Sequence, residues 1–347
     1  MLLVFLSGGL FLGWSLGAND AANVFGTAVG TRMIRFGTAA LICSLCLVVG
    51  AVIGGTGTTE TLGQLGAVNA LGGAFMVALA AAFTVFGMTR LSLPVSTSQA
   101  VVGAIIGWNF YSGSPTDVST LIKIVTTWVA CPILAGLFAV LLYLGLMAAF
   151  RHFPLHLVWE DVVLRWGLIL TGAFGSYSLG ANNIANVMGV FVPVSPFKPL
   201  DVAGLFTLDG IQQLFLIGGF AIAVGVFTYS RRVMETVGGS LMHLNAPMAL
   251  VVVLAHSLVL YLFSSQELSV WLSSHHLPTI PLVPVSSSQA VVGGVLGLGL
   301  LKGGRGIKYR VLGEIAAGWV TTPVVACAIT FVGLFFLQNV FAIQVMQ

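Results

Sequence analysis

Long apolar runs restrict this chain to a membrane fold. Of its 347 residues, 58% are hydrophobic and only 7% are charged, whereas about a quarter of the residues in an ordinary soluble domain carry a charge. Runs of about 20 apolar residues, long enough to cross a hydrocarbon core of roughly 30 Å as helices, recur along the chain with short polar breaks. They leave no stretch for a soluble domain, so we expect an all-α polytopic membrane protein. The first run lacks a basic start and a small-residue cleavage site, so we expect it to be retained.

The apolar segments fall into two sets of five that repeat the same strings. SLGANDAANV (15–24) matches SLGANNIANV (178–187), PVSTSQAVVG (94–103) matches PVSSSQAVVG (284–293), and WVACP (128–132) matches WVTTP (319–323). A charged connector at 151–161 separates a first repeat, 1–150, from a second, 162–347. The ten expected segments are 2–29, 37–55, 68–88, 93–110, 119–149, 162–192, 203–230, 237–265, 280–301 and 309–337.

The basic residues predict how the chain crosses the membrane. If the amino terminus lies outside and each segment crosses once, only Lys123 and Lys198 fall outside. The inner loops and segment ends then hold Arg32, Arg35, Arg90, Arg151, Arg165, Arg231, Arg232, Lys302, Arg305, Lys308 and Arg310. Five crossings per half turn the second half over, which predicts an inverted repeat with both termini outside the cytoplasm. Inverted repeats are typical of secondary transporters, whose sites lie near the midplane.

Polar strings interrupt the apolar runs at matching positions of the two halves. A charge near the bilayer centre costs about 2.5–3.5 kcal/mol on insertion scales, so Asp20 is expected to face protein or water and to serve a function. Asparagines of a single motif could simply join helices by hydrogen bonds. Two GAN motifs in oppositely oriented halves instead favour one shared midplane site. A glycine followed by asparagines, which disfavour helix, also predicts a helix broken at each motif.

The two serine-rich strings predict helix N-termini. Proline is favoured near a helix start and serine at its cap, and such an end attracts anions through its N–H groups and dipole. Simple capping at the membrane surface could explain one string, but the repetition and the following Gln99 and Gln289 favour binding. Segments 93–110 and 280–301 are either crossings or re-entrant hairpins, and the basic residues favour crossings.

Together the two motifs resemble the inorganic phosphate transporter family, whose signature is GAND with a second copy in an inverted half. The resemblance spans nearly the whole chain, from Gly17 to Pro323. This chain has Asn183 where many members have aspartate, has Gln99 and Gln289 where eukaryotic members often have histidine, and lacks the large central loop of animal members. It is similar to short, bacterial-type members, which places it in an inner (plasma) membrane.

The resemblance implies a cation-coupled symporter of inorganic phosphate, working by alternating access and favouring a homodimer. The expected phosphate-binding residues are Asp20, Asn23, Ser96, Thr97, Ser98, Asn183, Asn186, Ser286, Ser287 and Ser288. The expected cation-binding residues are Asn19, Asp20, Asn182, Gln99 and Gln289. The coupling cation is sodium or, alternatively, a proton. No other metal, no cofactor and no nucleic-acid partner is expected; the other partner is the lipid bilayer.

The chemistry of these residues fits the resemblance. Phosphate keeps at least one proton near neutral pH, so Asp20 can accept a hydrogen bond from it, whereas sulfate has no proton to share. Hard cations take oxygen ligands from carboxylates, amides and hydroxyls. Neutral donors with no nearby lysine or arginine would bind phosphate only when the cation is also present, which is a physical route to coupling.

Other functions have weaker support. An enzyme would need a nucleophile with a base in reach, but His256 is the sole plausible base and no Gly-x-Ser-x-Gly string is present. A lone histidine in an apolar run is more often a helix-to-helix hydrogen bond than a proton relay. An anion channel would line a continuous pore, whereas polarity here is concentrated at one depth. The main alternative is a permease for another tetrahedral oxyanion, such as sulfate or arsenate.

Overall fold

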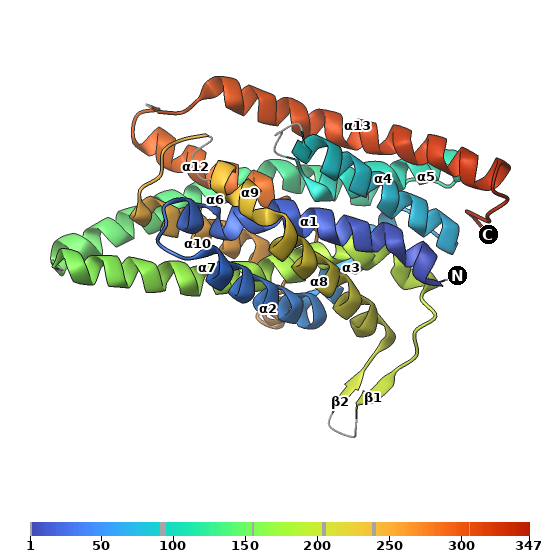
Figure 1. The fold of residues 1–347 in the computed structure, drawn as a ribbon, viewed down its shortest axis with the longest axis horizontal. Coiled ribbons are helices and arrows are strands. Elements are labelled where there is room, and N and C mark those ends of the chain that lie inside the picture. The colour runs from blue at the N-terminus through green and yellow to red at the C-terminus, as the bar shows by residue number, and fades with distance from the viewer. Residues whose placement is uncertain (1, 91–94, 155, 203–205, 238–240, 305) are drawn as a thin grey trace.

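The protein is a bundle of long helices (Figure 1). A computed structural model describes residues 2–347 apart from 91–94, 155, 203–205, 238–240 and 305. Within these residues, eight helices are long and apolar enough to cross a membrane. They are α1 Leu2–Gly30, α2 Phe36–Gly54, α4 Leu71–Arg90, α6 Val118–His152, α7 Leu157–Met188 with its 3₁₀ continuation η1 Gly189–Val194, α8 Gly210–Thr228, α10 Ala246–Ser264 and α13 Tyr309–Asn339. The chain is therefore an α-helical polytopic membrane protein, as its composition predicted.

Shorter helices complete the bundle. They are α3 Thr56–Leu65, α5 Thr97–Ser112, α9 Ser230–Val237, α11 Gln266–Ser274 and α12 Ser287–Leu301. With 16 and 15 residues, α5 and α12 are at most about 24 Å long, too short to cover a hydrocarbon core of roughly 30 Å. Val95 and Ser96 before α5, and residues 277–286 before α12, are non-helical. The described part of each predicted segment, 95–110 and 280–301, therefore combines non-helical chain with a short helix. The count of ten crossings stays a prediction.

A small β-hairpin projects from one end of the bundle (Figure 1). Strand β1 Leu200–Val202 pairs antiparallel with β2 Phe206–Leu208, and Asp201 lies opposite Thr207. The hairpin joins η1 to α8, and its second strand lies inside the predicted membrane segment 203–230. The predicted start of that segment is wrong, because its helix begins only at Gly210. Apart from the hairpin, the described regular structure is helical.

The helices pass through both GAN motifs without a break, so the predicted breaks are wrong. α1 is helical through its motif, and α7 is helical to Met188. The motif glycines serve close packing instead. A side chain at Gly17 would collide with the carbonyl of Ile222 on α8, and one at Gly180 with the carbonyl of Leu47 on α2. Tertiary packing of this kind overrides a weak intrinsic helix propensity.

The other two repeated strings also pack against each other across the halves. α5 lies against α13, and α12 lies against α6. A side chain at Gly103 would collide with the backbone of Pro323, and one at Gly293 with the backbone of Pro132. The glycine that ends each serine-rich string therefore contacts the proline that ends the WVACP or WVTTP string of the opposite half.

Candidate functional site

The first GAN motif presents the charged part of the site from α1. Asn19 Nδ2 donates to Asp20 Oδ1 at 2.7 Å, and Asn23 Nδ2 donates to Ser287 Oγ at 2.9 Å. Asp20 is 2% exposed, whereas both asparagines are partly exposed. Among the buried side chains of the described residues, only Asp20 is a carboxylate. A buried carboxylate with one amide donor has lone pairs to spare for a cation or a proton donor.

The second GAN motif, on α7, is uncharged and fully buried. Asn186 Nδ2 lies 3.0 Å from Ser98 Oγ and 2.9 Å from Asn183 Oδ1, and it can donate to both. Asn183 Nδ2 donates in turn to the carbonyl of Leu179 on the same helix at 3.2 Å. The second motif thus forms a chain of hydrogen bonds that ends on the serine-rich string of the first half.

Both serine-rich strings begin helices, as the sequence predicted. Ser96 Oγ accepts from the backbone N–H of Gln99, and Ser286 Oγ accepts from that of Gln289, each at 3.3 Å. These caps are buried inside the protein rather than at its surface. Ser286 and Ser288 hydroxyls lie 3.1 Å apart. Pro94 of the first string lies outside the described residues.

Hydrogen bonds bring the four strings together crosswise. Asn23 of the first half reaches Ser287 of the second, and Asn186 of the second reaches Ser98 of the first. Ser98 Oγ also donates to the carbonyl of Val285 at 3.1 Å, which joins the two helix starts directly. Four predicted residues from four separate stretches of sequence, Asn23, Ser98, Asn186 and Ser287, are therefore joined directly.

Several predicted residues in this region have buried polar atoms with no hydrogen-bond partner among the described residues. They are Thr97 Oγ1, Gln99 Oε1, Gln289 Oε1, Asn186 Oδ1, and both side-chain atoms Nδ2 and Oδ1 of Asn182. Leaving such a group unpaired costs about 1–3 kcal/mol. The set is rich in amide oxygens, which suit a hard cation such as sodium, while the hydroxyls and amide N–H groups suit an oxyanion.

The structure adds two residues that sequence reasoning did not assign to the site. His256 on α10 is fully buried, with Nε2 2.9 Å from Ser287 Oγ. The bond joins two helices, as expected of a lone histidine, but its partner is a site serine. Thr58 on α3 is buried and donates to the carbonyl of Asn182 at 3.4 Å. The polar string TGTTET could have signalled Thr58, but the partner of His256 is visible only in the fold.

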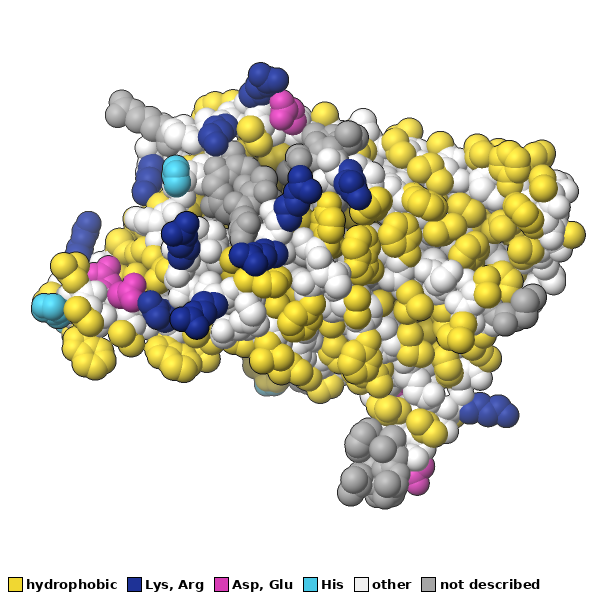
Figure 2. Space-filling model, in the orientation of Figure 1, with side chains coloured by type: hydrophobic (Ala, Val, Ile, Leu, Met, Phe, Trp, Pro, Cys, Tyr) yellow, Lys and Arg dark blue, Asp and Glu magenta, His cyan; other side chains and the backbone are white. Residues whose placement is uncertain are grey.

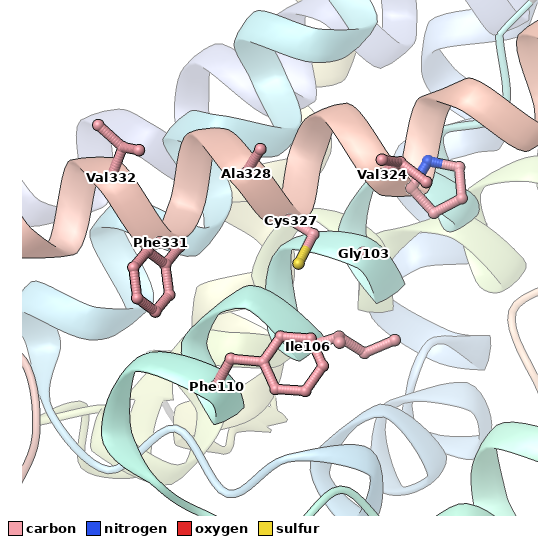
Figure 3. A pocket seen from close by; sticks show the side chains of 9 residues that line it. Gly103, Ile106, Phe110, Val324, Cys327, Ala328, Phe331 and Val332 are labelled. Carbon is pink, nitrogen blue, oxygen red and sulfur yellow. The ribbon is translucent and has the colours of Figure 1, made fainter.

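An apolar groove between α5 and α13 lies outside this polar network (Figure 3). Its volume is about 550 Å³, and its lining includes Gly103, Phe110, Pro323, Cys327 and Phe331. A second groove of about 470 Å³, between α1 and α8, is lined by residues such as Leu10 and Trp14. Neither lining contains a predicted site residue. Apolar walls offer no hydrogen bonds to replace the water that a small oxyanion would lose on entering. The polar region is therefore the better candidate for an oxyanion site.

Fold and site together define an α-helical integral membrane protein with a polar site buried between its two halves. The chain matches the model of the Phosphate transporter family over residues 16–162, 156–330 and 276–346. It belongs to this family.

Named relatives agree with this membership. A candidate phosphate permease of Methanocaldococcus jannaschii is 26% identical, with 93% of each chain covered. The sulfate permease of Bacillus subtilis is 28% identical over 97% of this chain and 89% of its own. A solved structure, a sodium-dependent phosphate transporter, superposes with a TM-score of 0.76 at 24% identity over 97% and 98% of the two chains, so the two share a fold. These relatives are permeases and transporters rather than enzymes, in agreement with the sequence analysis.

Proposed function

We propose that the protein is a cation-coupled symporter of inorganic phosphate that works by alternating access, with sodium as the coupling ion. The observation that carries the proposal is the crosswise network in which both GAN motifs and both serine-rich helix starts meet beside one buried carboxylate. Membership of the phosphate transporter family supports the substrate. The named sodium-dependent relative of the same fold supports the choice of sodium over a proton.

The division of roles follows from the chemistry of the side chains. Hydroxyls and amide N–H groups donate hydrogen bonds to the oxyanion, and Asp20 accepts a hydrogen bond from the proton that phosphate retains. The proposed phosphate-binding residues are Asp20, Asn23, Ser96, Thr97, Ser98, Asn183, Asn186, Ser286, Ser287 and Ser288. The proposed sodium ligands are Asn19, Asp20, Asn182, Gln99 and Gln289.

Charge balance is the proposed source of coupling. Among the buried side chains that the structure describes, none is a lysine or an arginine. An oxyanion that enters beside Asp20 would add negative charge to a site that already holds a carboxylate. Sodium bound to the carboxylate and amide oxygens offsets that charge, so phosphate binding requires sodium.

We also propose ten crossings in two inverted repeats, 1–150 and 162–347, joined by a cytoplasmic linker at 151–161, with both termini outside an inner membrane. The two termini lie at the same end of the bundle (Figure 1). Lysine and arginine side chains gather at the opposite end on the face seen in Figure 2, as expected of a cytoplasmic side. Arg305, counted among the inner basic residues, lies outside the described residues. The homodimer that the resemblance favours stays a prediction.

Uptake of radiolabelled phosphate into proteoliposomes tests the proposal. We expect uptake with an inward sodium gradient and not with a proton gradient or with neither. Asp20→Asn should lose it, whereas Asp117→Asn, the same change at an exposed helix cap, should keep it. Uptake driven by protons alone would change the coupling ion, and no uptake under any gradient would contradict the substrate.

Sulfate is the second candidate substrate, because a relative that spans nearly the whole chain is a sulfate permease. Unlabelled sulfate added in excess distinguishes the two. We expect it to leave phosphate uptake unchanged, because sulfate has no proton to donate to Asp20. Strong competition by sulfate would make the site a general oxyanion site. Electrical recordings with channel-sized currents would contradict a symporter of either anion.

A further inference from the structure

Ser287 Oγ lies between an amide and an imidazole. Asn23 Nδ2 is 2.9 Å from it on one side, and His256 Nε2 is 2.9 Å from it on the other. The second ring nitrogen of His256, Nδ1, is buried without a hydrogen-bond partner in the described chain. The polarity of this three-residue network decides whether Ser287 can donate to an anion.

Counting protons leaves two arrangements. A serine hydroxyl has one proton and accepts two hydrogen bonds, and the amide of Asn23 takes one acceptor position because Nδ2 can only donate. If the proton of a neutral His256 is on Nδ1, then Nε2 must accept the Ser287 proton, and a buried N–H stays unpaired. If the proton is on Nε2, His256 donates to Ser287, and the hydroxyl proton is free for a ligand.

An oxyanion in the site favours the second arrangement. With the anion bound, the Ser287 proton has an acceptor, and the only unpaired group is the Nδ1 lone pair. The first arrangement would instead keep an unpaired buried N–H, which is rare in folded proteins, and would turn the Ser287 proton away from the anion. Ligand binding and the position of the histidine proton are therefore linked.

The serine-rich string of the first half has no such arrangement. Thr97, the residue that matches Ser287, has a buried hydroxyl with no hydrogen-bond partner among the described residues. The next residue, Ser98, accepts from Asn186 and donates its proton to the carbonyl of Val285.

An Asn-Ala pair lies at the start of both helices, with Asn69 near the start of α4 and Asn245 as the N-cap of α10. Counted from these asparagines, the position of His256 corresponds to Ala80 on α4. The alanine side chain cannot donate a hydrogen bond, so among the described residues a hydroxyl held by a histidine is a property of the second half.

We propose that His256 is a positioning residue of the anion site, which donates from Nε2 to Ser287 and thereby directs the Ser287 hydroxyl proton to the bound oxyanion. The inference rests on the proposed function, since it needs an oxyanion beside Ser287. His256 itself does not touch the anion. Its role is to donate to the Ser287 oxygen, so that the Ser287 hydroxyl can only donate its own proton to the anion.

Nitrogen NMR of the protein with labelled histidine tests the proton position directly. The chain has six histidines, and the signal of His256 is assigned as the one lost in His256→Gln. With saturating phosphate and sodium we expect a neutral ring with its proton on Nε2. A proton on Nδ1, or on both nitrogens, would overturn the proposal.

Transport kinetics provide the second readout. His256→Leu removes the donor and should raise the KM for phosphate by roughly 2- to 13-fold, the effect of one ordinary hydrogen bond, with kcat little changed. His256→Gln offers an amide N–H in place of Nε2 and should restore most of the affinity. In a Ser287→Ala background, His256→Leu should have no further effect on KM. Additive effects of the two substitutions would contradict the proposal.

Controls separate this inference from the proposed function. Ser257→Ala changes the neighbouring residue of α10, whose hydroxyl bonds only its own helix, and should leave KM unchanged. Wild-type protein that binds phosphate while His256→Leu keeps its KM contradicts the histidine role alone. Wild-type protein that binds sulfate but not phosphate contradicts the proposed substrate, and the NMR test is then made with sulfate. Binding of neither anion contradicts both.

Discussion

The two GAN motifs occupy matching positions in the sequence but differ in charge and exposure. Asp20 is ionisable, and its neighbours Asn19 and Asn23 are partly exposed. The matching Asn182, Asn183 and Asn186 are neutral and fully buried. The first motif therefore has partly exposed polar atoms, whereas the polar atoms of the second are all enclosed by protein. The two copies of the string therefore differ: the first brings the ionisable group, whereas the second, besides its proposed ligand atoms, has Asn186 bonded to the serine-rich helix start of the first half.

Removing the charge difference between the two GAN motifs should have the largest effect on transport. Asp20→Asn makes the first motif GANN, like the second, and we expect sodium-driven phosphate uptake to fall by roughly 10- to 150-fold, since a bond to a charged group contributes about 1.5–3 kcal/mol. Initial rates in proteoliposomes at subsaturating sodium measure this loss. Adding Asn183→Asp should not restore uptake. Recovery in that double variant would mean that either copy can carry the charge.

The two close glycine–proline contacts between the halves should contribute equally to the stability of the fold. Gly103→Ala and Gly293→Ala each force a methyl group against a proline backbone and should each destabilise the fold by about 1–3 kcal/mol. Thermal unfolding in detergent measures the change. Gly145→Ala on α6, with nothing within 4 Å of its added methyl, is the control and should not lower the melting temperature. A large effect for only one of the two glycines would contradict matched packing.

The asparagines at the end of each motif should differ in their effect on stability. Asn186→Ala leaves Ser98 and Asn183 without their buried donor and should cost about 1–3 kcal/mol, whereas the partly exposed Asn23 should cost about 0.5–1.5 kcal/mol when changed to alanine. Thermal unfolding without phosphate ranks the two. A greater loss of stability for Asn23→Ala would contradict the larger contribution of the Asn186 hydrogen bonds to the fold.

The smallest difference concerns how the last helix of each half begins. Side-chain hydrogen bonds from Thr120 and Ser119 hold the pKa of Asp117, the N-cap of α6, below its ordinary value. Lys308, at the start of α13, has no side-chain oxygen to accept such bonds. Because the folded pKa is lowered, the stabilisation by Asp117 is complete above about pH 4 and is lost as the pH falls through the lowered value.

Asp117→Asn keeps a capping oxygen but cannot titrate. We expect the wild-type protein to lose slightly more stability than this variant as the pH falls below about 4. Melting temperatures of the two proteins over that range measure the difference. Identical pH profiles would show that the ionised cap does not contribute.

Much of this arrangement could be predicted from the sequence because it depends on local patterns. Apolar length predicted the spans, and proline followed by serine predicted helix starts capped by Ser96 and Ser286. The repeated strings predicted that distant residues would meet, and the bonds of Asn23 and Asn186 join them. The assignment of each side chain to phosphate or sodium stays a prediction.

The failures came from features that depend on tertiary contacts. The helices do not break at the GAN motifs, because Gly17 and Gly180 are needed where another backbone approaches, and sequence alone cannot distinguish that use of glycine from a break. In the sequence, His256 is only a single polar residue in an apolar run, a pattern that does not predict its partner. Its importance depends on which serine it reaches, and that is decided by how α10 packs against α12.

Equilibrium binding of labelled phosphate to the purified protein tests the central claim most directly, because a single site shared by both halves fixes the stoichiometry and the sodium requirement. We expect one phosphate per chain in the presence of sodium, none when potassium replaces sodium, and weakened binding in both Asn23→Ala and Asn186→Ala. Two phosphates per chain, or equal binding without sodium, would contradict a single coupled site built from the two halves.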